Sequence, residues 1–193
     1  MDALIKLDGD ILLWIQDNLR TGWLDPIMKF ITSLGNAGIL WIALCILMII
    51  FKKTRQTGIV SACSLAAAFT INNLIIKNVV ARTRPYEAIE ALNRIVSAES
   101  DYSFPSGHTT ASFAVAVVMF MELPKKYGVP ALIMAFLIAF SRLYVGVHYP
   151  SDVIVGMITA TIYAIIAVTI YRKCFKNKAN RITENQSEKS EGR

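Results

Sequence analysis

The chain has 193 residues, of which 54% are hydrophobic and only 18% are charged, and its mean hydropathy is +0.47. Soluble domains usually carry about 25% charged residues, so this composition argues against a soluble protein and indicates a small protein with several membrane spans. The formal charge of +6 does not indicate a nucleic-acid partner, because the basic residues lie in short clusters between apolar runs.

The first 51 residues contain two apolar segments. Residues 9–19 have apolar side chains at helical spacing. They predict either an amphipathic helix in the membrane interface, anchored by Trp14 and Trp23, or an ordinary packed helix. Residues 30–51 carry no charge and are long enough to form a span, in which Gly35 and Gly38 are candidate kinks.

Four further apolar runs follow between residues 58 and 171. The sequence therefore predicts an all-α integral membrane bundle with about five transmembrane helices plus an N-terminal interfacial amphipathic helix. The membrane domain is expected over residues 1–172. Residues 173–193 form a basic and polar tail that we expect to be disordered. The expected spans are about 30–51, 58–78, 105–123, 129–147 and 152–171.

The basic clusters predict the orientation of this multi-pass protein in the cell membrane. The turns at 52–55 and 125–126 and the tail fall on one side of a five-span arrangement, which the positive-inside rule assigns to the cytoplasm. The N-terminus, the 77–108 connection and the 142–152 turn then lie outside. This topology places seven polar side chains on the outer face: Lys77, Arg84, Ser106, His108, Arg142, His148 and Asp152.

Two of the polar segments on this face suit an anion. Lys77 and Arg84 are seven residues apart, so they would share a face if the helix continued, although Pro85 favours an extended Arg84. Taken alone, they could equally be basic residues that snorkel at a helix end. Pro105-Ser106-Gly107-His108 opens the third span, where unpaired backbone N–H groups, the Ser106 hydroxyl and the small Gly107 could cradle a phosphate. The alternative is a Pro-Gly turn with an interface histidine.

The third segment, from Ser141 to Asp152, adds a cation and a second histidine. Arg142 suits bidentate contact with a phosphate. His148 and Asp152 are four residues apart, so the carboxylate can orient the imidazole and make it a better nucleophile or base. A simple surface His–Asp pair would leave Arg142 unexplained.

Together, the three segments offer three cations, a helix N-terminus, two histidines and one orienting carboxylate. One histidine could attack phosphorus while the other protonates the leaving oxygen, and the cations would stabilise the transition state. The three cysteines show no CxxC spacing, and no cluster of Asp, Glu or Cys indicates a metal. We therefore expect neither a metal nor another cofactor.

These motifs closely resemble the three signatures of the type 2 phosphatidic acid phosphatase family, in order and without substitution: Lys77-x6-Arg84-Pro85, Pro105-Ser106-Gly107-His108 and Ser141-Arg142-x5-His148-x3-Asp152. The resemblance covers residues 77–152 and implies a metal-independent phosphatase on a helical bundle. By family analogy, His148 is the nucleophile that forms a phosphohistidine, Asp152 orients it, and His108 is the general acid. The residues implied to hold the phosphate are Lys77, Arg84, Ser106, Gly107 and Arg142.

The expected function is hydrolysis of a lipid phosphate or diphosphate at the outer leaflet, with the lipid tail remaining in the bilayer. In its length and arrangement of spans the chain is similar to small bacterial undecaprenyl-diphosphatases of this family, so undecaprenyl diphosphate is the favoured substrate. The alternatives are phosphatidylglycerol phosphate and phosphatidic acid. A non-catalytic lipid-phosphate binder or transporter is a further alternative, but binding alone would need only the cations and not both histidines.

Overall fold

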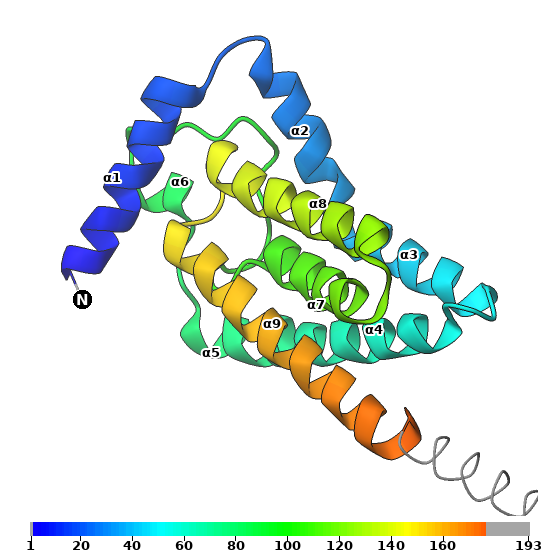
Figure 1. Cartoon of the computed structure of the whole chain (residues 1–193). Coiled ribbons are helices and arrows are strands. Elements are labelled where there is room, and N and C mark those ends of the chain that lie inside the picture. Colours follow the sequence, from blue (N-terminus) through cyan, green and yellow to red (C-terminus); the bar gives the residue numbers. More distant parts are fainter. Residues whose placement is uncertain (1, 177–193) are drawn as a thin grey trace, which may run out of the picture.

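The computed structural model describes residues 2–176, and helices are the only regular structure in that range (Figure 1). The predicted all-α bundle is confirmed, and several of its helices have the length and hydropathy of membrane spans. Three helical segments are long and apolar enough to cross one, and a bent pair adds a fourth if it counts as one span. The elements are α1 (Asp2–Leu19), α2 (Leu24–Leu34), η1 (Asn36–Gly38), α3 (Ile39–Ile50), α4 (Arg55–Ala68), η2 (Phe69–Ile76), α5 (Lys77–Val80), α6 (Pro85–Ala88), α7 (Gly107–Glu122), α8 (Lys125–Tyr144), α9 (Pro150–Tyr171) and η3 (Arg172–Lys176).

Helix α7 is the centre of the bundle, with α8, α9, α4 and α3 packed around it. It has 16 residues, about 24 Å at 1.5 Å per residue, which is shorter than the hydrocarbon core of about 30 Å. Its small and β-branched side chains allow close neighbours, and residues such as Ala114, Val115 and Val118 are completely buried. The expected span at 105–123 is thus the enclosed helix of the bundle, and its crossing of a membrane stays a prediction.

The first expected span is two helices joined by a bend. The helix begins at Leu24 rather than near Phe30, and the chain bends by 45° between α2 and the η1–α3 segment. Ala37 and Gly38 adopt left-handed backbone conformations, with φ of 50° and 66°, which interrupts the helix. The kink expected at Gly35 and Gly38 is confirmed. The helix start at Leu24 is a separate matter from the membrane boundary, so the expected span at about 30–51 stays a prediction.

A buried polar network joins η2 to its neighbours inside the bundle. Residues 69–76 form a π-helix, a geometry that often occurs near functional sites. Within it, the fully buried Asn72 donates to Thr110 Oγ1 at 3.1 Å and to Thr159 Oγ1 at 2.7 Å, and accepts from the Tyr163 hydroxyl at 2.9 Å. Because hydrocarbon offers no hydrogen-bond partners, this network fixes the first turn of α7 and the middle of α9 against η2.

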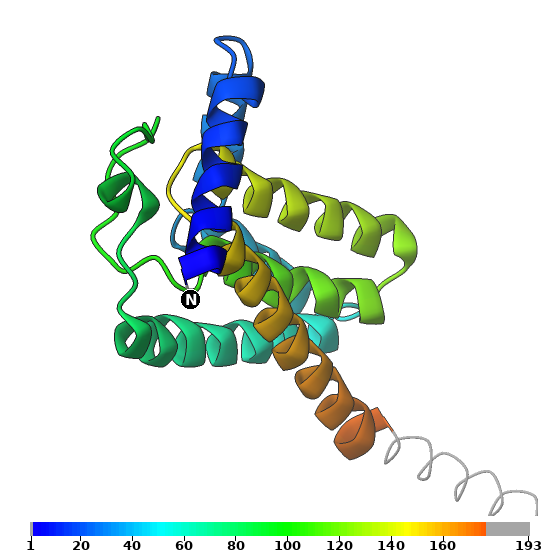
Figure 2. The ribbon, with the colours of Figure 1, turned by 90° about the vertical axis from the view of Figure 1, so that its left-hand side faces the viewer.

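Helix α1 lies across one end of the bundle (Figure 2). Leu12 and Ile15 are buried against the α8 and α9 ends, whereas Leu4 and Trp14 on the other face are 60% and 57% exposed. The helix is therefore both packed and apolar on its outer surface, which combines the two interpretations of residues 9–19. A helix crossing the ends of membrane-length helices suits the membrane interface.

The basic turns lie at the opposite end from α1. Figure 1 shows the α3–α4 turn, the α7–α8 turn and the end of α9 all on that side. This grouping agrees with the loop pattern from which the orientation was predicted, and the orientation itself stays a prediction. Residues 177–193, which make up most of the expected tail, lie outside the described residues.

A stripe of small residues brings α9 close to α7. Gly156, Ala160 and Ala164 are buried at every fourth position of α9 after Asp152. A Cβ added at Gly156 would lie 3.1 Å from both the Ser106 carbonyl oxygen and Thr110 Oγ1, which is tighter than an ordinary contact.

We expect Gly156→Leu to lower activity or folded yield, because extra carbons between well-packed helices cost about 1–3 kcal/mol. Phosphate release and yield of purified protein would measure the effect. The control is Ile158→Leu, since Ile158 is 53% exposed on the same helix. Full activity at normal yield in Gly156→Leu would show that the close approach is unimportant.

Candidate active site

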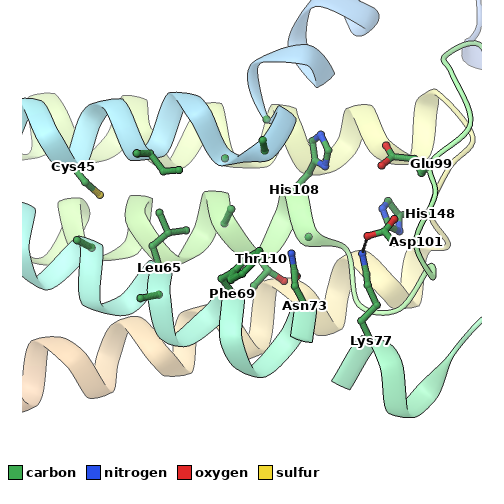
Figure 3. A pocket seen from close by; sticks show the side chains of 18 of the residues that line it. Cys45, Leu65, Phe69, Asn73, Lys77, Glu99, Asp101, His108, Thr110 and His148 are labelled. Atoms are coloured by element: carbon green, nitrogen blue, oxygen red, sulfur yellow. Dashed lines mark hydrogen bonds and ion pairs between the residues drawn. The ribbon is translucent and has the colours of Figure 1, made fainter. Parts of the chain in front are cut away.

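One cavity of about 750 Å³ runs between α3, α4 and α7 and combines two chemically different ends (Figure 3). Its inner part is apolar, with Cys45, Leu65 and Phe69 among the lining side chains. Its other end is polar and lies toward the α1 end of the bundle. That end is lined by Asn73, Lys77, Arg84, Glu99, Asp101, Gly107, His108 and His148.

The eight predicted site residues gather at this polar end. They come from the α5–α6 segment, the start of α7, the end of α8 and the start of α9, which are far apart in the sequence. Lys77, Arg84, Gly107, His108 and His148 line the cavity. The other three lie behind this first layer of side chains: Ser106, Arg142 and Asp152.

His148 is placed to act through one ring nitrogen while the other faces a carboxylate. It lies in the turn between α8 and α9 and is 1% exposed. Its Nδ1 is 3.5 Å from Asp152 Oδ2, longer than an ordinary hydrogen bond. Its Nε2 is 3.4 Å from Arg84 Nη1, so this nitrogen points toward the cations.

Asp152 is held by several donors besides His148. Its Oδ2 accepts from the Tyr149 backbone N–H at 2.9 Å and from the Ser103 hydroxyl at 2.5 Å. Its Oδ1 accepts from Arg82 Nη1 at 2.6 Å, and Arg82 Nη2 donates to Asp8 Oδ2 at 2.8 Å. The carboxylate is completely buried, so these contacts replace the water that an ionised group needs.

The surroundings of His148 favour the neutral imidazole that a nucleophile requires. Burial removes the water that would solvate an imidazolium, and Arg142 and Arg84 add positive charge nearby. Although Asp152 acts in the opposite direction, the net effect lowers the pKa of His148 to about 4.

We therefore expect His148 to stay neutral from pH 8 to pH 5.5 and to gain its proton only as the pH falls toward about 4. The chain has two histidines, so an NMR titration of labelled imidazoles in detergent should show two signals. The His108→Asn variant should show only the signal of His148, which assigns both. A His148 signal that titrates near its ordinary value of about 6.5 would contradict the role of burial.

Two carboxylates from the loop between α6 and α7 neutralise the cations. Asp101 lies 2.5 Å from both Lys77 Nζ and Arg84 Nη2. Arg142 Nη2 donates a hydrogen bond to Glu99 Oε1, and the second carboxylate oxygen of Glu99 lies 3.8 Å from Arg84 Nη2. Burial opposes ionisation of Asp101, but the hydrogen bonds and charges of Lys77 and Arg84 outweigh it and lower its pKa to about 2. Each carboxylate thus occupies a place between two cations that a phosphate oxygen could take.

Asp101→Asn is expected to tighten binding of inorganic phosphate by about 3- to 10-fold, because it removes a negative charge that competes for Lys77 and Arg84. The effect is modest since the Asp101 side chain is half-exposed. The inhibition constant of phosphate as a product inhibitor measures it. Glu90→Gln, at an exposed position of the same loop, should leave the constant unchanged. An unchanged or weaker affinity in Asp101→Asn would contradict this competition.

The start of α7 differs in detail from the expected phosphate cradle. Ser106 is the N-cap: its Oγ accepts from the Thr109 N–H at 3.4 Å and from the Thr109 hydroxyl at 3.0 Å, and it is fully buried. The hydroxyl therefore caps the helix rather than lining the cavity. Gly107 does line it, beside Asn73, and His108 extends into it from the first turn.

Lys77 and Arg84 reach the same carboxylate although they do not share a helix face. Helix α5 ends at Val80, and Ala81 has a φ of 48°. Arg84 is extended, with φ −73° and ψ 149°, as expected before Pro85. The turn, rather than helical spacing, brings the two cations together.

The family model of the PAP2 superfamily matches residues 58–176, which is more than half of the chain. The chain belongs to the PAP2 superfamily. This match includes all three motif segments and the second half of the bundle, so the resemblance carried by the motifs is confirmed at the level of the family.

Several PAP2 relatives are lipid phosphatases. The chain is 33% identical over 147 residues to an undecaprenyl-diphosphatase of Sulfolobus acidocaldarius, covering 76% of this chain and 70% of the relative. It is 34% identical over 139 residues to undecaprenyl-diphosphatase BcrC of Bacillus subtilis, covering 72% and 70%. Its fold matches a crystal structure of the Bacillus subtilis PAP2-type phosphatidylglycerolphosphate phosphatase with a TM-score of 0.76 and 26% identity over 90% and 89% of the two chains. The chain is a lipid phosphatase of the membrane.

Sequence reasoning missed several side chains of this PAP2 site. Arg82, which holds Asp152, stands between the two selected cations, and its position in the same short basic segment was a usable signal. Glu99 and Asp101 lie in the irregular loop between α6 and α7, where no hydrophobic periodicity singles them out. Asp8 and Asn36 lie in the N-terminal part of the chain and gave no signal, because nothing in their local spacing links them to a site more than 60 residues away.

Proposed function

We propose that the chain hydrolyses undecaprenyl diphosphate at the outer leaflet through a phosphohistidine intermediate. The observation that carries the proposal is a cavity whose cationic, histidine-bearing end continues into an apolar part between α3, α4 and α7. A lipid phosphate has the same two halves. Its headgroup would bind at the polar end while its tail follows the apolar side chains.

In the proposed reaction, His148 Nε2 attacks the terminal phosphorus as the bond from phosphorus to the leaving oxygen breaks. His108 gives a proton to that oxygen. Water then attacks the phosphohistidine, passes a proton to His108, and releases inorganic phosphate and free His148. Lys77, Arg84 and Arg142 would stabilise the charge on the phosphoryl oxygens. Each histidine has a defined task, and both line the cavity.

The preference for a diphosphate of a polyprenyl lipid is supported by the undecaprenyl-diphosphatase relatives. A second candidate, a glycerolipid phosphatase acting on phosphatidylglycerol phosphate or phosphatidic acid, is favoured by the fold match to the phosphatidylglycerolphosphate phosphatase. A non-catalytic binder or transporter is disfavoured by the placement of two histidines in the cavity.

A substrate panel with purified protein in detergent tests the proposal. Phosphate release from undecaprenyl diphosphate, phosphatidylglycerol phosphate and phosphatidic acid should be compared by kcat/KM in the presence of a chelator. The highest value is expected for undecaprenyl diphosphate, with no requirement for added magnesium. A higher value for a glycerolipid would favour the second candidate, and no release from any substrate would favour a binder.

The outer-face assignment needs its own experiment. A single cysteine introduced at Ser97, in a chain whose own cysteines are replaced, should react with an impermeant thiol reagent in intact cells. Ser97 lies in the exposed part of the loop between α6 and α7. Labelling only after lysis would place the active site on the cytoplasmic side.

A further inference from the structure

We propose that Asn36 is a positioning residue for His108: its amide oxygen holds the Nε2–H of the imidazole, so that Nδ1 delivers the proton to the leaving oxygen. This inference rests on the proposed role of His108 as general acid. It adds a residue that lies before residue 58, where the PAP2 family match begins.

The bend between α2 and α3 holds one edge of the His108 ring. Asn36 Oδ1 lies 3.0 Å from His108 Nε2. Next to it in the sequence, Gly35 leaves the space that the ring fills, since a Cβ added there would lie 2.5 Å from His108 Cδ2. Nε2 and Cδ2 are neighbouring ring atoms, so one side of the imidazole is fixed by two successive residues of the bend. The bend itself depends on the left-handed conformations of Ala37 and Gly38.

The chemistry of an amide oxygen decides which ring nitrogen exchanges its proton. An amide oxygen only accepts hydrogen bonds, so it keeps a hydrogen on Nε2. The imidazolium form of His108 then has its second N–H at Nδ1. When the bond from phosphorus to the leaving oxygen breaks, the Nδ1–H bond breaks and an O–H bond forms, which leaves a neutral His108 with its hydrogen still on Nε2. Asn36 thus favours both the correct orientation and the correct tautomer.

The need for this contact depends on the leaving group. The lipid alcohol of phosphatidic acid leaves as a strongly basic alkoxide and requires a proton, whereas a nitrophenolate is weakly basic and leaves without one. The lipid monophosphate released from undecaprenyl diphosphate is also a weak base, so phosphatidic acid is the more sensitive lipid substrate for this comparison. General acid catalysis contributes about 100- to 10,000-fold where the proton is required. Loss of the contact should therefore slow the first kind of substrate and spare the second.

The test compares Asn36→Ala with the unaltered protein on phosphatidic acid and on p-nitrophenyl phosphate, using kcat/KM, which reports the steps up to cleavage of the phosphorus–oxygen bond. We expect a loss of about 10- to 100-fold on the lipid and less than about 3-fold on the aryl ester. Asn18→Ala is the matched control, because Asn18 is an exposed asparagine bonded only to its own helix, at the Trp14 carbonyl. An equal loss on both substrates, or no loss on the lipid, would overturn the inference.

A second variant separates positioning from a merely structural role. Asn36→Asp keeps an acceptor beside Nε2, so it should restore most of the activity on phosphatidic acid. Its negative charge favours the imidazolium, and the general acid must be protonated to act. The decline of kcat/KM on the alkaline side should therefore move to higher pH than in the unaltered protein.

The other charges near His108 are unchanged in this comparison. Positive charge comes from Lys77 on α5, Arg84 before α6 and Arg142 on α8, and His148 lies in the α8–α9 turn, while Glu99 and Asp101 of the loop line the same cavity. If Asn36→Asp is as inactive as Asn36→Ala, or its alkaline limb does not move, the amide oxygen is not the group that matters. If His148→Ala still releases phosphate, the proposed function itself fails, independently of Asn36.

Discussion

His148→Ala is expected to lower kcat for phosphate release by at least about 1,000-fold, the largest effect of any single change in this protein. No other described side chain offers a neutral, buried imidazole nitrogen directed at the cations. His148 Nε2 lies 3.4 Å from Arg84 Nη1, and its burial keeps the ring unprotonated. Reactions quenched in alkaline detergent, where phosphohistidine is stable, with substrate labelled in the terminal phosphate would measure both turnover and labelled protein.

The control for this prediction is His108→Asn. If His108 acts only as a proton donor and acceptor, the variant should still form labelled protein from p-nitrophenyl phosphate, which needs no proton to leave. His148→Ala should form none. Labelled protein in His148→Ala, at a level similar to the unaltered chain, would mean that another group is the nucleophile.

Arg84→Gln should lower kcat/KM by about 100- to 1,000-fold, the range seen when one preorganised donor to a developing charge is removed. Arg84 is 2% exposed and is fixed by the Val147 carbonyl at 2.9 Å and the Asp101 carbonyl at 2.8 Å. Its guanidinium contacts both His148, the proposed nucleophile, and the Asp101 carboxylate that marks a place for an anion. Phosphate release at several substrate concentrations would separate kcat from KM.

Arg84→Lys should recover little of this loss, because a single ammonium group cannot contact the Val147 carbonyl, the Asp101 backbone carbonyl and the phosphoryl group at once. Arg94→Gln is the matched control, since Arg94 stacks on the Tyr86 ring at 4.8 Å, in the same region of the chain. Near-normal activity in Arg84→Lys, or the same loss in Arg94→Gln, would contradict the assignment of the phosphate site to Arg84.

The bundle helices and the site segments could be predicted because they depend on local sequence patterns. The features that were missed depend on contacts between residues far apart in the chain. Long apolar runs and charged interruptions are local properties, so the positions of α4, α8 and α9 and the polar residues at their ends could be read directly. The start of α2 at Leu24 has a local signal in Asp25-Pro26, a pair typical of a helix N-terminus, whereas the uncharged run alone begins only at Phe30. The packing of Met28 against α8 has no such local signal. The roles of Glu99 and Asp101 depend on a loop with no periodicity, whose path is set by the cations it meets.

The contact between α1 and the start of α9 has a consequence for the charge that His148 experiences. Arg82 alone would cancel the charge of Asp152. Asp8 supplies a second carboxylate to the same guanidinium, so the three ionised groups sum to −1 rather than zero. In the proposed reaction, the imidazole becomes positive when it bonds to phosphorus, and this remaining negative charge lies beside it. Asp8 in the first helix would thus help to set the electrostatic balance of the reaction proposed at His148.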